Sequence, residues 1–391
     1  AGIYSSVEIG AEVIVPLVLA GYYGQTSLVS IQNADVTAAQ TVQVAVRGIG
    51  SVAASADADF TVAPGAAVTI DFARDADFAL LQQAAPNGFV GWMRVTSAAA
   101  VAVQSFIDVT TSPQAAYAFE GVPSSRLATE LVAPLVRKRQ RTSIGTFDSG
   151  IAVVNPGAAP ATVAVRYDGS AGGCAGQSFD EAPITIHAGD GATIYQGTSP
   201  VLPDGCVASA RITSTVPLAA VVLDSKDLTV QGAAYTAVPL ADAARRTVLP
   251  LVRRGHTALR LTTGIQLTNP GETDAQADLA FADHDGHPAA SCGAACRVTV
   301  PARGSRTLFP SSTFAALPPG VYGSGVVHSD QPLVVLVNDI AESGAADAAT
   351  YLGLGADEAG SASPAPPLAG VGAIGARRGA TGGRAFLTFG P

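Results

Sequence analysis

A short motif occurs three times in this sequence: Val15-Pro16-Leu17-Val18, Ala133-Pro134-Leu135-Val136 and Leu249-Pro250-Leu251-Val252. The three prolines lie 118 and 116 residues apart. Four more landmarks follow each motif in the same order. They are the asparagine that ends an apolar stretch (Asn33, Asn155, Asn269), the glycine of a turn (Gly88, Gly205, Gly320), an aspartate (Asp108, Asp224, Asp339) and a tyrosine (Tyr117, Tyr235, Tyr351). Landmarks that keep one order and one spacing indicate internal repeats. We therefore interpret the chain as three copies of one unit, with an extra segment at each end.

The landmarks divide the 391 residues into five parts. We predict repeats at 11–127, 128–244 and 245–356, preceded by an extended strand at 1–10. Residues 357–391 contain a linker rich in Gly, Ala and Pro, followed by the apolar stretch Phe386-Leu387-Thr388-Phe389 and the final Gly390-Pro391.

Each unit has the pattern of an all-β domain. The second unit contains short apolar or alternating stretches separated by Gly, Pro and Asp, at 149–155, 161–167, 184–186, 192–195, 207–213, 218–223 and 233–238. Seven or eight short strands in about 115 residues are typical of an immunoglobulin-like sandwich. Only 75–83 in the first unit is compatible with one or two helical turns. We predict three tandem immunoglobulin-like β-sandwich domains with extended N- and C-terminal segments.

Composition excludes several classes of protein. Hydrophobic residues make up 48% of the chain, which is too many for intrinsic disorder. Lys and Arg number 22 against 31 Asp and Glu, and no basic stripe is present, which argues against a nucleic-acid partner. No apolar run approaches the roughly 20 residues of a membrane span. Because the chain begins Ala1-Gly2, without Met, we expect a mature chain cut behind a signal peptide and therefore a secreted, extracellular or cell-surface location.

The four cysteines favour disulfide bonds in an oxidising compartment. We predict the pairs Cys174–Cys206 and Cys292–Cys296. The alternative is one zinc site using all four, but they fall in different units and lack paired zinc-ligand spacing on both sides.

Other polar clusters are interpreted as structural. Asp283-His284-Asp285-Gly286-His287 is dense in metal ligands, but Asp285-Gly286 aligns with the turn dipeptide Asp168-Gly169, so we expect a solvated turn. Asp57 and Asp59 are expected in an exposed loop without the pattern of a helical calcium loop. The three repeated aspartates are expected to cap a strand end or a turn. The basic run 137–141 is either a solvated loop or an electrostatic contact with an acidic neighbour, either the next domain or another subunit.

Motifs of the common enzyme classes are missing from the sequence. It has no nucleophile elbow, phosphate-binding loop, dinucleotide fingerprint or zinc-protease helix motif. We expect no enzyme activity, no catalytic residue, no cofactor and no metal.

The three units resemble the repeats of bacterial exported cell-surface and extracellular filament proteins. In those repeats a Pro-Leu-Val strand precedes a Gly-Ile-x-Val-x-Asn strand and a turn, as in Gly150-Ile151-Ala152-Val153-Val154-Asn155. The resemblance covers 11–356. It implies spacer or assembly domains with a structural role, and it transfers no catalytic residue.

The two chain ends suggest how such a protein would assemble. Phe386, Leu387 and Phe389 follow a linker with nothing to bury them, and Ile3, Val7 and Ile9 share one face of an extended strand. A terminal strand of this kind can add to an open sheet edge of a neighbouring subunit. We predict a structural subunit of a homopolymeric extracellular filament, with copies of itself as partners and contacts to the cell envelope or surface glycans. The alternative is a surface adhesin or an array of carbohydrate-binding modules.

Overall fold

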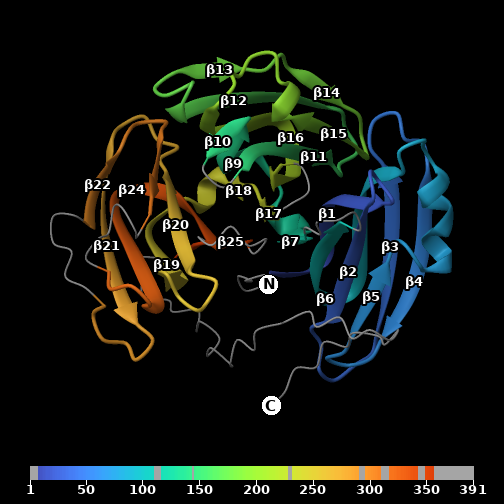
Figure 1. Ribbon diagram of the computed structural model, residues 1–391. Helices are drawn as coiled ribbons and strands as arrows, with labels where there is room; N and C mark the ends of the chain where they lie inside the picture. The colour runs from blue at the N-terminus through green and yellow to red at the C-terminus, as the bar shows by residue number, and fades with distance from the viewer. Residues whose placement is uncertain are drawn as a thin grey trace.

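The structure is a computed structural model that describes residues 8–109, 116–142, 145–227, 231–289, 296–309, 317–341 and 348–355. Within these residues the regular elements are β-strands and four short 3-10 helices. The strands form three antiparallel sandwiches, one for each repeat (Figure 1). The prediction of an all-β chain with three tandem sandwich domains is confirmed.

The first sandwich shows the layering that all three share. One layer has the strand order β4-β3-β6-β1-β8, and the other has the order β5-β2-β6-β7. Apolar side chains from both layers, such as Val44 and Ile31, meet in one core. The helical turns expected at 75–83 are confirmed as η1, which buries Phe78 and Leu81. The elements are β1 (Ile9–Ala20), β2 (Gln25–Asn33), β3 (Gln40–Gly48), β4 (Ser55–Val62), β5 (Ala67–Asp71), η1 (Ala76–Gln83), β6 (Phe89–Val109), β7 (Ala116–Glu120), β8 (Val122–Pro123) and η2 (Ser124–Arg126).

The second and third sandwiches repeat this order. The second consists of β9 (Ala128–Lys138), β10 (Gln140–Thr142), β11 (Gly145–Asn155), β12 (Ala161–Gly172), β13 (Ser178–Asp180), β14 (Ile184–Ile186), β15 (Asp190–Tyr195), η3 (Gln196–Thr198), β16 (Cys206–Lys226), β17 (Gln231–Thr236), β18 (Val238–Pro239) and η4 (Leu240–Asp242). The third consists of β19 (Ala244–Arg253), β20 (Leu261–Thr268), β21 (Ala275–Asp283), β22 (Arg297–Val300), β23 (Ser305–Leu308), β24 (Tyr322–Ala341), β25 (Ala348–Leu352) and β26 (Leu354–Gly355).

One long strand in each sandwich belongs to both layers: β6, β16 and β24. The sequence predicted two strands, 207–213 and 218–223, where the structure has the single strand β16. Its first part pairs with β9 and β12, and its last part pairs with β11 and β17. Pro217 lies where the strand crosses between the layers, so its missing N–H removes no ladder hydrogen bond.

The repeated Pro-Leu dipeptide forms a bulge in the first strand of each sandwich. Pro134 and Leu135 are skipped in the pairing between β9 and β16. The Leu135 N–H donates to the Tyr235 hydroxyl at 3.1 Å, and that hydroxyl donates to the Leu135 carbonyl oxygen. Tyr351 makes the same two bonds to Leu251. A buried tyrosine therefore satisfies both backbone groups that the bulge removes from the ladder.

The first sandwich departs from this pattern. Phe119 precedes Val122-Pro123 by the same distance as Tyr235 precedes Val238-Pro239, and both Val-Pro pairs bind the first strand of their sandwich. Tyr117, which the sequence had aligned with Tyr235, lies two positions earlier. That alignment is wrong, because the residue in the position of Tyr235 is Phe119, which has no hydroxyl to bind the bulge.

We expect Tyr235→Phe to lower the free energy of unfolding by about 1–3 kcal/mol, because the buried Leu135 N–H and C=O then lose their partner. Denaturant unfolding measures the loss. Tyr195→Phe is the matched control, since Tyr195 is 40% exposed, and we expect its effect to stay within about 0.5 kcal/mol. Equal effects of the two substitutions would contradict the role given to Tyr235.

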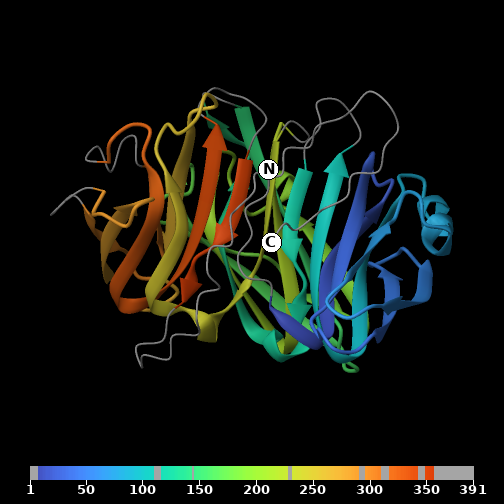
Figure 2. The same cartoon turned by 90° about the horizontal axis from the view of Figure 1, so that it is seen from below.

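The three sandwiches gather around a common centre, where β7, β17 and β25 lie nearest one another (Figures 1 and 2). β17 contacts both β7 and β25. The Tyr117 ring covers Gly232 so closely that a Cβ there would lie 2.2 Å from a ring carbon, and the Tyr117 hydroxyl is 3.0 Å from Ser225 Oγ. On the other side, Leu336 and Leu352 of the third sandwich pack against the core of the second. The repeats thus form one continuous body.

Candidate functional site

The junction between the first and second sandwiches is closed and largely apolar. Ile14, Ile49 and Trp92 of the first sandwich pack against Val154 and Ala219 of the second. The indole N–H of Trp92 donates to the Gly189 carbonyl oxygen at 3.1 Å. Trp92 thus supplies both apolar packing and a hydrogen bond at this junction.

The junction between the second and third sandwiches has Ser209 in the place of Trp92. Trp92 of β6 lies opposite Arg47 of β3, and in the same register Ser209 of β16 lies opposite Asp168 of β12. Two residues further on, Arg94 lies opposite Ile14, and Arg211 lies opposite Val132. Replacing an indole with a hydroxymethyl group leaves space, and a pocket of about 130 Å³ lies here.

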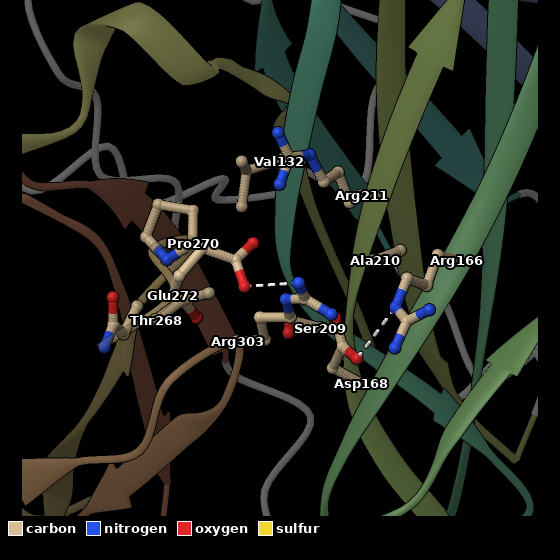
Figure 3. A pocket seen from close by; sticks show the side chains of 11 residues that line it. Val132, Arg166, Asp168, Ser209, Ala210, Arg211, Thr268, Pro270, Glu272 and Arg303 are labelled. Carbon is tan, nitrogen blue, oxygen red and sulfur yellow. Dashed lines mark hydrogen bonds and ion pairs between the residues drawn. The ribbon is translucent and has the colours of Figure 1, made fainter. Parts of the chain in front are cut away.

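Charged side chains from both sandwiches line this pocket (Figure 3). Arg166 Nε lies 3.2 Å from Asp168 Oδ1, and Arg303 of the third sandwich pairs with Glu272. Arg211 binds Glu130 at 2.6 Å. The Arg303 guanidinium beside Glu272 holds the pKa of that carboxyl below its usual range, so Glu272 is ionised at neutral pH. The pocket therefore offers both guanidinium donors and carboxylate acceptors.

One predicted disulfide is confirmed. Cys174 and Cys206 are bonded, with their Cα atoms 5.1 Å apart, and both side chains are buried. The bond ties the loop after β12 to the start of β16. Cys296 is also disulfide-bonded, and its predicted partner, Cys292, lies outside the described residues.

The predicted assembly residues fall mostly outside the described part of the chain. Ile9 is described: it begins β1, lies opposite Ala102 of β6 and is 55% exposed. Ile3, Val7, Phe386, Leu387 and Phe389 lie outside the described residues, so their role stays a prediction.

Two of the repeated aspartates belong to buried polar clusters. Asp224 lies inside β16, where it accepts a hydrogen bond from Ser149 Oγ at 3.0 Å and lies 3.4 Å from the Arg137 guanidinium. Asp339 of β24 likewise binds Thr263 Oγ1 at 3.1 Å and pairs with Arg253. The prediction that the aspartates cap a strand end is wrong for these two.

The third aspartate, Asp108, is not their equivalent. Ser27 lies opposite Ile107, as Ser149 lies opposite Asp224. The first sandwich therefore has Ile107 where the other two have aspartate. Its Leu19 N–H donates to Ser27 Oγ, just as the Arg137 N–H donates to Ser149 Oγ, so Leu19 stands in place of the arginine.

The basic run 137–141 makes electrostatic contacts within its own sandwich. Arg137 pairs with Asp224, and Arg139 pairs with Asp204 at 3.0 Å. Lys138 Nζ donates to the Ser199 and Leu202 carbonyl oxygens at 2.7 and 2.6 Å. The sequence predicted either a solvated loop or a contact with the next domain or another subunit. The acidic partners in the structure, Asp204 and Asp224, belong to the same sandwich instead.

The turn expected at Asp283–His287 is confirmed, but the alignment with Asp168-Gly169 is wrong, because Asp168 lies inside β12 opposite Ser209. Asp283 Oδ1 accepts the N–H groups of Asp285 and His287 at 3.0 and 2.9 Å. The loop expected around Asp57 and Asp59 is instead the edge strand β4, where Asp57 pairs with Arg47 at 2.6 Å.

Together these features define a multidomain β-sandwich protein with a polar pocket between two of its domains. The chain belongs to DUF5719, a family of unknown function that matches residues 141–386. A search of curated proteins finds no match.

Solved structures give three comparisons. Thermotoga maritima 1070 is 17% identical, with 29% of this chain and 96% of that chain covered and a TM-score of 0.24. The Anabaena sensory rhodopsin transducer is 18% identical, with coverages of 24% and 92% and a TM-score of 0.19. A tetra-tandem repeat in the extending region of a large adhesion protein is 11% identical, with coverages of 90% and 75% and a TM-score of 0.13. Among the described residues, no helix is long and apolar enough to cross a membrane.

Proposed function

We propose that this protein is a structural subunit of an extracellular assembly, in which copies join through a terminal strand into a homopolymeric filament. The observation that carries the proposal is the packing of three repeats into one body. Tyr117 lies on Gly232 of the next sandwich, and Trp92 fills the junction between the same two domains. Apolar packing between the domains holds the three repeats of one chain together, and a chain joined in this way is suited to act as a scaffold.

The disulfide supports the proposed location. Cys174 and Cys206 are bonded, and disulfides persist mainly in secreted and cell-surface proteins, where the surroundings are oxidising.

The edge strand β4 is the acceptor that we propose for the terminal strand. Among the described strands it pairs only with β3. η1 also contacts it, but no strand pairs with the outward-facing backbone groups along its eight residues. The edges that correspond to it in the other sandwiches are shorter, with three residues in each of β13 and β14 and four in β22. A long open edge is a template for strand addition.

Light scattering of the full chain and of chains lacking 384–391 or 1–7 tests the proposal. We expect the full chain to form species much heavier than one copy, and we expect removal of the donating strand to return the mass to that of one chain. A synthetic peptide of residues 384–391 is expected to block growth if the C-terminal strand is the donor. An assembly state that neither truncation nor peptide changes would rule out terminal-strand exchange.

The second candidate function is a surface adhesin or carbohydrate-binding array. One observation favours it, namely the polar pocket between the second and third sandwiches. Its ligand is argued below.

A further inference from the structure

We propose that the pocket between the second and third sandwiches binds a sugar acid, a single hydroxylated ring that carries one carboxylate. The proposal goes beyond the structural role and does not depend on polymer formation, because the pocket is complete within one chain.

The polar side chains of the pocket are specific to this junction. In the register of the ladders, Arg166 takes the place of Ala45 in the first sandwich and Ala280 in the third. Asp168 takes the place of Arg47 and Ala282. A junction that served only to hold two domains together would be stabilised most by apolar packing such as that of Trp92. The charged lining instead points to recognition of a ligand.

Arg303 provides a second, independent observation. It has a φ of 52°, in a turn that Gly304 closes by donating to the Pro301 carbonyl oxygen. The equivalent turns of the first and second sandwiches have glycine at this position, Gly65 with a φ of 64° and Gly189 with a φ of 71°. A side chain is disfavoured at such angles, so arginine here strains the backbone where glycine would not. Strained residues of this kind cluster at ligand sites, and this strain places a guanidinium beside Glu272 in the pocket.

The donors and acceptors of the lining select the chemistry of the ligand. Arg166, Arg211 and Arg303 each carry five N–H donors and no acceptor. Arg211 and Arg303 each pair with one carboxylate and Arg166 pairs with two, Asp168 and Asp180, so N–H donors remain for a carboxylate of the ligand. Asp168 and Glu272 would repel a bare inorganic anion, but they accept hydrogen bonds from hydroxyl groups. A ligand with hydroxyl groups and one carboxylate would bind both the arginine donors and the carboxylate acceptors of the lining. The size agrees, because the pocket stands where the first junction holds the indole ring of Trp92.

The binding test titrates the full chain with sodium D-glucuronate by isothermal titration calorimetry and ligand-observed NMR. We expect saturable binding of one glucuronate per chain. D-Glucose, which lacks the carboxylate, is expected to bind at least about tenfold more weakly, since hydrogen bonds between charged groups are the stronger ones. No binding of glucuronate, or equal binding of glucose or of inorganic sulfate, would overturn the proposal.

Three variants locate the binding. Ser209→Trp places an indole where Trp92 lies at the first junction, and we expect it to abolish binding without lowering the melting temperature. Ser324→Trp is the matched control, because Ser324 lies opposite Ala282 as Ser209 lies opposite Asp168, but it does not line the pocket. We expect Ser324→Trp to leave glucuronate binding unchanged.

Arg303→Gly restores the glycine of the other two repeats. We expect it to weaken glucuronate binding at least about tenfold while the melting temperature stays the same or rises, because the backbone strain is relieved. This variant tests whether glucuronate binds in the pocket even if Ser209→Trp does not fold. Binding that survives Arg303→Gly would overturn the proposal. The truncations that test filament formation leave this pocket intact, so the two proposals fail independently.

Discussion

Replacing Asp224 with alanine is expected to destabilise the second sandwich by about 3–5 kcal/mol, because the Arg137 charge then remains buried without its partner. The side chains of Arg137 and Asp224 are only 15% and 8% exposed. The Arg137 guanidinium also lies 4.4 Å from the centre of the Phe147 ring, so it is packed in place and cannot easily turn out to solvent. Denaturant unfolding followed by circular dichroism measures the loss.

The first sandwich suggests a compensated variant. It carries Leu19 and Ile107 where the second carries Arg137 and Asp224. We expect the double variant Arg137→Leu, Asp224→Ile to recover most of the stability that either single change removes, since well-packed apolar residues often replace a buried ion pair without loss. A double variant as unstable as the sum of the single variants would contradict this account.

The single variant Arg137→Leu adds a dependence on pH. Burial raises the pKa of the Asp224 carboxyl, and Arg137 and Ser149 act against the rise. Without Arg137 the folded-state pKa rises further above the unfolded value. Stability linked to a raised pKa is complete below the unfolded pKa and is lost as the pH rises through the folded one. The variant should therefore lose stability relative to the unchanged protein as the pH rises above about 4, the ordinary pKa of an aspartate carboxyl.

Removal of the Cys174–Cys206 disulfide is expected to cost about 3–4 kcal/mol, because the bond closes a long loop and so restricts the unfolded chain. The two cysteines are 32 residues apart in sequence. The variant Cys174→Ala, Cys206→Ala measures the loss by denaturant unfolding. The corresponding change at Cys292 and Cys296 should cost less, since those residues are only four positions apart.

Reducing agent provides the control for this prediction. We expect it to lower the stability of the unchanged protein and to have a much smaller effect on the variant without Cys174 and Cys206. A variant that is as stable as the unchanged protein would show that the bond does not restrict the unfolded state in this way.

The sequence predicted the repeats and the all-β fold because both depend on local patterns. Turn residues and alternating apolar stretches recur in each unit, and a confirmed turn such as Asp283–His287 is set by its own side chains. The Cys174–Cys206 bond was predictable because Cys292 and Cys296 of the third unit are close enough in sequence to pair with each other. That pairing leaves Cys174 and Cys206 for the second bond.

The error at Asp108 has a physical cause. Successive side chains of a strand point to opposite faces, so a shift of one residue moves a side chain from the core to the other side. The structure pairs Ile107 with Ser27, and Asp108 is therefore on the opposite face from Asp224 and Asp339. Sequence spacing alone does not resolve a one-residue shift between repeats.

The pocket was not predicted, because it depends on how two sandwiches meet. Its residues come from β9, β12 and β16 of the second sandwich and from the end of β20 and two turns of the third, and they share no local motif. Two signals were nevertheless present. Ser209 aligns with Trp92, and Arg303 aligns with Gly189, so a residue-by-residue comparison of the repeats would have marked both positions as unusual.

The pairing of the first and last strands in each sandwich determines the shape that the chain can take. β8 runs antiparallel beside β1, with Pro123 opposite Val13, and β18 lies beside β9 in the same way. The chain therefore enters and leaves each sandwich at the same end. Only η2 and Leu127 separate the first sandwich from the second, and only η4 and Ala243 separate the second from the third. Domains connected in this way turn around an axis, and adding a repeat would widen the molecule without lengthening it. A force applied to the two ends of one sandwich would break the backbone hydrogen bonds between its first and last strands one after another.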